Sequence, residues 1–145
     1  MVAQSRRLDR WVAVGVGGAL GTLARYEVTL AIPTHTNRFP WAIALVNLLG
    51  CLVVGGVMAA LHARPGAPDT VRLFLVVGVC GGLTTFSSWM VGDVLLVRDG
   101  ASPVAVLDLV GSLAGGVAAV WLAYRLVSAA LHTPIEGDLD VRDAD

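Results

Sequence analysis

The chain has 145 residues, of which 56% are hydrophobic and only 14% are charged, and its mean hydropathy is +0.75. Soluble domains carry about 25% charged residues, so this composition excludes a soluble globular protein. The net charge of −1 supplies no basic surface for nucleic acid. We therefore expect an all-α integral membrane protein without a nucleic-acid partner and, because little chain remains outside the membrane, without enzymatic activity.

Four apolar windows follow one another along the chain, at residues 11–32, 41–61, 74–97 and 103–127. A helix of about 20 residues crosses the hydrocarbon core of a bilayer, so each window predicts one transmembrane helix. The connections between them are short and contain proline and glycine, which are typical of turns. Residues 1–128 are thus a predicted four-helix membrane domain, and residues 129–145 are an acidic tail that we expect to be disordered.

Glycines are concentrated inside the windows, where small residues allow helix backbones to approach closely. The third window also contains the run Gly81-Gly82, followed at once by Thr84-Thr85. Four poor helix formers in five residues predict a third helix that is broken in the middle of the membrane. Irregular backbone at that depth is tolerated where protein buries it or where it lines a polar cavity. The break is therefore a candidate site.

Polar side chains inside the windows are functional candidates because they cost free energy in lipid. They are Asn47 in the second window, the segment from Thr84 to Trp89 in the third, and Asp108 with Ser112 in the fourth. Residues four apart, such as Asp108 and Ser112, share a helix face. Simpler roles stay open: helix-to-helix hydrogen bonds for the third-window hydroxyls, an interhelical amide bond for Asn47, and a backbone bond for Ser112.

Charged residues in or near the windows fall into two groups. Arg25 is deep enough in the first window to be buried against polar backbone, whereas Glu27 is expected to extend towards the membrane surface. Asp93 and Arg125 lie near window ends, which predicts positions at the interface between membrane and water. The three histidines lie outside the windows, so no nucleophile, base and oxyanion set can be assembled.

Amide N–H groups, hydroxyls and aromatic ring edges all suit a small anion that loses its water. The carboxylate or carbonyl rings that a cation pore requires are mostly absent. Two other classes remain open. A proton-coupled small-molecule exporter would use Glu27, the one intramembrane glutamate of the first window. A structural, non-conducting membrane subunit would use none of these polar groups for transport.

Three sequence blocks resemble the successive signatures of the fluoride channels (Fluc, also called CrcB). The blocks are GGALGTLARY at 17–26, VNLLG at 46–50 and GVCGGLTTFS at 78–87. The resemblance extends from about residue 11 to residue 126, and the third block is the most specific. It implies a four-helix subunit, an antiparallel (inverted) dimer, two fluoride pores at the dimer interface and one structural sodium ion.

The resemblance also assigns roles to individual residues. It implies an ion pathway formed by polar and aromatic side chains, namely Asn47, Thr85, Phe86, Ser87 and Ser112. It implies a structural role for Arg25 and a sodium ion held by the backbone carbonyls of Gly81 and Thr84. Two pathway positions depart from the family pattern: Trp89 stands in place of a second phenylalanine, and Asp108 in place of a tyrosine.

Arginine is distributed unequally between the two predicted membrane faces. The face with both termini carries Arg6, Arg7, Arg10, Arg64, Arg72, Arg125 and Arg142, and the other carries Arg38 and Arg98. The positive-inside rule then places both termini in the cytoplasm, with the chain in the cell inner (plasma) membrane. A chain committed to one orientation needs an inverted partner, so we expect a heterodimer with a homologous chain more than a homodimer.

Overall fold

The computed structural model describes residues 2–33 and 38–131. Within these residues every regular element is helical, which confirms the predicted all-α class. The end of the predicted acidic tail, residues 132–145, lies outside the described residues.

The elements follow the predicted windows closely. They are α1 (Val2–Ala31), α2 (Trp41–His62), α3 (Asp69–Arg72), η1 (Leu73–Cys80), α4 (Gly81–Leu83), α5 (Phe86–Arg98) and α6 (Ser102–Ala130). Only α1 departs strongly, because it begins nine residues before the window at residue 11. α6 ends at Ala130, two residues beyond the predicted domain boundary at residue 128. η1 is a π-helix, a form that is rare and that is frequently found at functional sites.

Three helical stretches of the described residues are long and apolar enough to cross a membrane: Trp41–His62, Asp69–Arg98 and Ser102–Ala130. α1 is long enough, but Arg25 and Glu27 interrupt its apolar part. Together with the composition, these stretches make the chain a multi-pass membrane protein.

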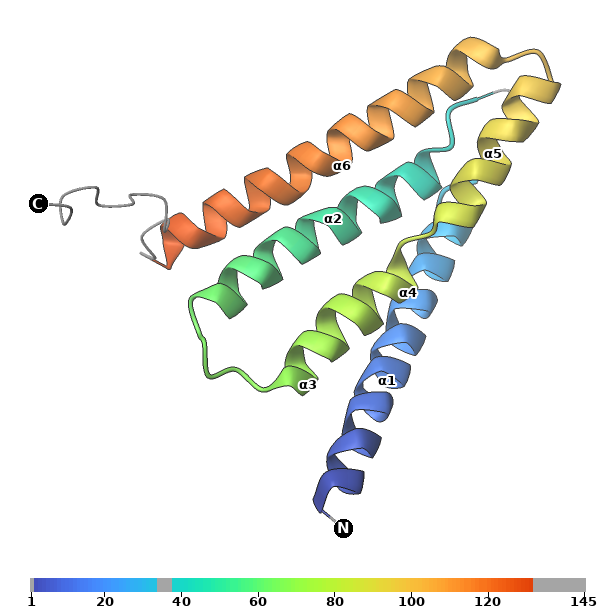
Figure 1. Ribbon diagram of the computed structural model, residues 1–145. Coiled ribbons are helices and arrows are strands. Elements are labelled where there is room, and N and C mark those ends of the chain that lie inside the picture. Colours follow the sequence, from blue (N-terminus) through green and yellow to red (C-terminus); the bar gives the residue numbers. More distant parts are fainter. Residues whose placement is uncertain (1, 34–37, 132–145) are drawn as a thin grey trace, which may run out of the picture.

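The helices are arranged as two side-by-side pairs (Figure 1). α2 lies along α6, and the two run in the same direction. α1 lies along η1 and α4, and these helices also run in the same direction. α5 continues beyond α4 and packs against the start of α6, so it joins the two pairs.

Glycines bring the backbones of α1 and the third helix into contact. A Cβ atom added to Gly21 would collide with the carbonyl oxygen of Val79, and one added to Gly82 would collide with the carbonyl oxygen of Gly18. In contrast, Gly111 and Gly115 of α6 have no atom within 4 Å of such a Cβ. The first set holds this subunit together, whereas the second lies on its open surface.

Two extended residues separate α4 from α5. Thr84 has φ −78° and ψ 157°, and Thr85 has φ −147° and ψ 122°. The sequence analysis expected the irregular backbone to include Gly81 and Gly82, but both of these glycines are helical. The reason is that threonine is β-branched, which favours extended backbone, and that the Thr85 side chain caps α5.

Candidate functional site

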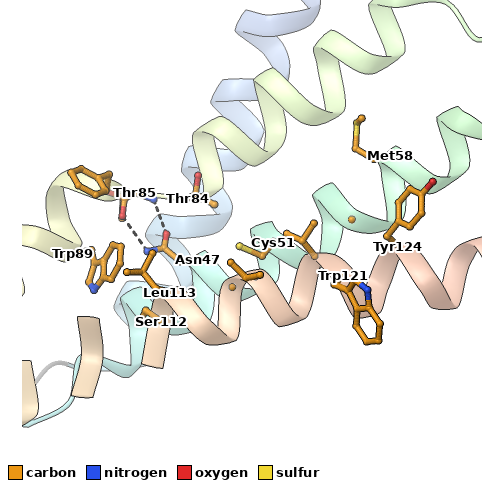
Figure 2. Close-up of a pocket in the computed structure, with 15 residues that line it drawn as sticks. Asn47, Cys51, Met58, Thr84, Thr85, Trp89, Ser112, Leu113, Trp121 and Tyr124 are labelled. Carbon is orange, nitrogen blue, oxygen red and sulfur yellow. Dashed lines mark hydrogen bonds between the residues drawn. The ribbon is translucent and has the colours of Figure 1, made fainter. Parts of the chain in front are cut away.

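A cavity of about 760 Å³ lies where α2, α6 and the break between α4 and α5 meet (Figure 2). Its polar lining residues are Asn47, Thr84, Thr85 and Ser112, and its aromatic ones are Phe86, Trp89, Trp121 and Tyr124. Cys51, Gly55 and Met58 of α2 and several small or aliphatic residues of α6 complete the wall. The sequence analysis did not anticipate the contribution of the second half of α6, because those residues carry no intramembrane charge.

Asn47 is fixed by the backbone of the helix break. Its Oδ1 accepts the N–H of Thr85 at 2.8 Å, and its Nδ2 donates to the carbonyl of Thr85 at 3.1 Å. These two bonds orient the amide unambiguously and leave one Nδ2 hydrogen free. Asn47 thus makes the interhelical bond that the sequence analysis kept as an alternative, and it still offers one donor.

Thr85 uses its hydroxyl to begin α5. Its Oγ1 accepts the N–H of Ser88 at 3.2 Å and donates to Ser88 Oγ at 3.0 Å. The N–H groups of Phe86 and Ser87, at the start of α5, have no acceptor in the preceding turn because α4 has ended. Thr85 is buried, whereas the Ser87 side chain is exposed and lines neither this cavity nor the smaller one described below.

Phe86 and Trp89 form an edge-on ring pair. Their centroids are 6.0 Å apart with an interplanar angle of 88°. Phe86 is 71% exposed in the single subunit, and Trp89 is 9% exposed. Both rings line the cavity near the start of α5, and the edge of an aromatic ring carries partial positive charge.

Ser112 connects the cavity to a buried acid. Its Oγ donates to Oδ1 of Asp108 at 2.8 Å, and Asp108 is fully buried. The bond runs to the carboxylate rather than to the backbone carbonyl expected as one alternative. Both carboxyl oxygens of Asp93, on α5, are buried as well. The sequence analysis expected Asp93 at the interface between membrane and water, and that position stays a prediction.

A second cavity, of about 230 Å³, lies on the other side of Asn47 and Ser112. Phe39, Trp41 and Leu45 form part of its wall, together with Gly111 and Gly115 of α6. Asn47 and Ser112 line both cavities. They therefore form the polar boundary between the two spaces.

The carbonyl groups at the end of α4 have unusual partners. Arg25 of α1 donates from Nη1 to the carbonyl of Thr84 at 3.2 Å. The helical partner of the Gly81 carbonyl is the N–H of Thr85, and this N–H donates to Asn47 instead. Gly81 is exposed, and a Cβ atom built on it would meet nothing within 4 Å. The break therefore leaves carbonyl oxygen available on the surface of the subunit.

Glu27, the residue that an exporter would require, is exposed on α1. It lines neither of the two cavities beside Asn47. No described group of three or more histidine, cysteine, aspartate or glutamate side chains could hold a metal ion. Fold and site together define a small multi-pass helical membrane protein whose polar groups meet at an interrupted helix.

Residues 12–124 match the family described as CrcB-like protein, Camphor Resistance (CrcB). The chain belongs to this family. A relative from Chlorobium chlorochromatii, named Fluoride-specific ion channel FluC, is 49% identical over 110 residues, which are 75% of this chain and 84% of the relative. Relatives of the same name from Prosthecochloris aestuarii and Chlorobaculum tepidum are 39% identical over 120 residues and 45% identical over 109 residues. These alignments cover 83% and 74% of this chain, and 94% and 86% of the relatives. All three relatives are named as channels, and the family is not one of enzymes.

Proposed function

We propose that this chain is a fluoride-selective ion channel that exports cytoplasmic fluoride passively. The observation that carries this proposal is the set of donors at the helix break. Asn47, which has a free Nδ2 hydrogen, lines one cavity together with the rings of Phe86, the first residue of α5, and of Trp89. The names of the relatives add fluoride as the anion.

The helix break supplies opposite partial charges at one place. The N-terminus of a helix carries partial positive charge and the C-terminus partial negative charge. α5 begins where α4 ends, two residues apart. Anions are thus favoured at the start of α5, and cations at the end of α4. We place this break in the membrane, as part of the third of four transmembrane helices, with α1 as the first.

Selectivity follows from the size of the ion and the rigidity of the donors. Asn47 is held by two hydrogen bonds, so its free N–H has a fixed direction. A fixed, narrow set of donors replaces the water shell of fluoride, whereas the larger chloride ion does not fit the same spacing. In this proposal the pathway is formed by Asn47, Thr85, Phe86, Ser87, Trp89 and Ser112. Asp108 belongs to it through the hydrogen bond that its Oδ1 accepts from Ser112.

A partner subunit completes the pathway. Phe86 and Ser87 are exposed, and a Cβ atom added to Gly111 or Gly115 would meet no atom within 4 Å in the single subunit. In an antiparallel dimer, these surfaces of two chains face each other and enclose two pores. The unequal distribution of arginine favours a homologous chain of opposite orientation as the partner, and so a heterodimer, in the cell inner membrane.

The donor set at the end of α4 fits a sodium ion. The Gly81 carbonyl has lost its helical partner. Among the described residues, the Thr84 carbonyl accepts one hydrogen bond, from Arg25. Sodium is commonly bound by unwound carbonyls and helix C-terminal ends in membrane proteins. We infer that the Gly81 and Thr84 carbonyls of two subunits hold one structural sodium ion, which would join the subunits at the break.

Sodium is expected to raise the thermal stability of the purified assembly. A ligand that binds only the folded state adds about 2.7 kcal/mol when its concentration is about 100 times its Kd. The measurement compares unfolding temperatures in sodium chloride and in an equal concentration of potassium chloride, after exhaustive dialysis. Equal unfolding temperatures in the two salts would remove the sodium ion from the account.

The C-terminus is expected on the cytoplasmic face in nearly all copies. A tag after residue 145 is labelled in intact cells and again in inverted membrane vesicles, with a periplasmic and a cytoplasmic protein as markers. We expect labelling of the vesicles only, because the arginine bias fixes one orientation. Equal labelling of both preparations would show dual orientation and would favour the homodimer.

Growth in fluoride tests the function in a cell. A bacterium that lacks its own fluoride channels is transformed with this chain alone, with the chain and a homologue, or with an empty plasmid. We expect growth in fluoride medium to be restored by the chain, alone or with the homologue, because passive export lowers cytoplasmic fluoride. The proposal fails if both chain-containing strains grow no better than the empty-plasmid strain although the protein is present in the membrane.

A further inference from the structure

A third cavity, of about 510 Å³, lies between the end of α2 and the start of α3 and η1. Its walls are mostly aliphatic: Val57 and Leu61 belong to the last turns of α2, Val71 to α3 and Leu75 to η1. Arg64, in the connection between these helices, also lines it. Pockets that bind small molecules have volumes of about 300–1,000 Å³. This cavity is therefore large enough for a ligand of its own, and it shares no lining residue with the two cavities beside Asn47.

The cavity lies where two membrane-capable stretches meet the membrane surface. One stretch ends at His62 and the next begins at Asp69, on the side of the molecule from which α1 starts (Figure 1). Val57 and Leu75 lie five and six residues inside these ends, which is about 8 to 9 Å along a helix. The aliphatic walls thus reach the level of lipid acyl chains, and Arg64 stays at the level of the headgroups.

The charge available in this cavity is positive. Among the described residues that line it, Arg64 is charged and none is acidic. Arg64 is exposed, and within residues 2–33 and 38–131 it forms no ion pair. The nearest acid along the chain, Asp69, is bound by Arg10 of α1, with Nη2 of the arginine 2.6 Å from Oδ2. Arg64 is therefore a cation that an anionic ligand can bind.

Hydrogen bonds and an ion pair fix the wall that carries Arg64. Its N–H donates to the carbonyl of Leu61 at 3.1 Å, and its own carbonyl accepts the N–H of Ala67 at 2.9 Å. The ion pair between Arg10 and Asp69 ties the start of α3 to α1. The connection between α2 and α3 is thus held at both ends, so the cavity and its arginine are formed before a ligand binds.

A cavity at the opposite end of the helices has a different charge pattern. It measures about 370 Å³, and Arg98 lies in its wall among aliphatic residues of α5 and α6. Asp93 lines this cavity as well, so groups of both signs are present. An anion is favoured beside Arg64 but not beside Arg98. Arg98, which is also exposed, is therefore a matched control for Arg64.

We propose that the cavity beside Arg64 binds an anionic phospholipid such as phosphatidylglycerol. The guanidinium group donates to the phosphate oxygens, and the upper part of an acyl chain lies against the aliphatic walls. Basic pockets between transmembrane helices are sites for anionic lipid headgroups. A soluble anion would use the arginine but not the walls, whereas a phospholipid uses both. This site is separate from the ion pathway, and the inference does not rest on the proposed fluoride channel.

Unfolding temperatures in a neutral detergent test this binding without transport. The purified assembly is titrated with phosphatidylglycerol, with phosphatidylcholine of the same acyl chains, or with glycerol 3-phosphate, which has the anionic group without acyl chains. We expect phosphatidylglycerol to raise the unfolding temperature by at least about 5 °C at about 100 times its Kd, and the other two additives to raise it clearly less. An equal increase with phosphatidylcholine or with glycerol 3-phosphate would overturn the proposal.

Three substitutions assign the effect to the cavity. Arg64→Gln removes the charge at an exposed position, so the phosphatidylglycerol concentration required for a given shift should rise about fivefold. Ala67→Glu keeps Arg64 but adds a carboxylate to the same wall, so we expect a rise at least as large. Arg98→Gln, the same change at the control position, should leave the wild-type concentration. An unchanged concentration in both Arg64→Gln and Ala67→Glu would overturn the proposal.

Mass spectra of the intact assembly detect the bound lipid directly. We expect phosphatidylglycerol to stay bound to the wild type and to Arg98→Gln after the detergent is removed, and to be lost largely from Arg64→Gln. Absence of bound phosphatidylglycerol from the wild type would show that another group, such as the partner subunit, covers the cavity, and it would overturn the proposal. These outcomes are the same whether or not the chain conducts fluoride.

Discussion

Replacing Asn47 by aspartate is expected to reduce fluoride efflux to the level of protein-free liposomes. The amide offers a free N–H to the cavity and holds the backbone of Thr85 with its other atoms. A carboxylate in its place puts a negative charge on the pathway. Two like charges about 4 Å apart repel by about 4 kcal/mol at an effective dielectric constant of about 20, which slows passage about a thousandfold.

Asn47→Leu separates the effect of the charge from the loss of the hydrogen bonds. Leucine has a similar shape and no charge, so we expect a smaller loss of efflux than with aspartate. All three proteins should show the same membrane insertion and elution profile, because only one interhelical contact changes. If Asn47→Asp conducts at the rate of the unchanged chain, Asn47 is a structural amide and lies outside the pathway.

Replacing Gly21 by alanine is expected to destabilise the fold strongly. The added methyl group would occupy the position of the Val79 carbonyl oxygen and approach the N atom of Leu83 at 2.8 Å. Both are backbone atoms, so α1 and the third helix have to move apart. Overpacking of this kind costs roughly 1–3 kcal/mol, and here it also displaces Arg25 from the Thr84 carbonyl. The measurement is the unfolding temperature in detergent.

Gly18→Ala is the matched control for this prediction. Gly18 lies three residues from Gly21 on the same helix, and a Cβ atom at Gly18 meets no atom within 4 Å. We expect its unfolding temperature to equal that of the unchanged chain or to exceed it slightly, because alanine favours helix over glycine. Equal unfolding temperatures for the two variants would mean that α1 does not contact the third helix through Gly21.

The helices could be predicted from the sequence because lipid requires long apolar runs. α2 begins at Trp41 and ends at His62, one residue from the predicted end. The start of α1 could not be predicted in this way, because its first turns are mostly polar and lie outside the apolar window. The exact position of the helix break could not be predicted from the sequence either. Glycine is a poor helix former on average, but packing against α1 holds Gly82 in a helix, and the chain departs at Thr84 instead.

The candidate site could be predicted in its residue types but not in its contacts. The sequence indicated Asn47 and Ser112 because intramembrane polar groups are costly. It did not indicate that Asn47 binds both backbone groups of Thr85, because this pairing joins residues 38 positions apart. It also missed the burial of Asp108 and of both carboxyl oxygens of Asp93, which depends on how the helices pack. Long-range pairing of this kind is determined by the tertiary fold.

Fluoride release from liposomes tests the central claim most directly. The purified chain, alone and co-purified with a homologous partner, is reconstituted with fluoride trapped inside, and an electrode follows the external fluoride after a potassium ionophore removes the opposing voltage. We predict rapid release of the trapped fluoride and no release of trapped chloride from matched liposomes. Release no faster than from protein-free liposomes in both preparations, or equal release of chloride, would contradict the account.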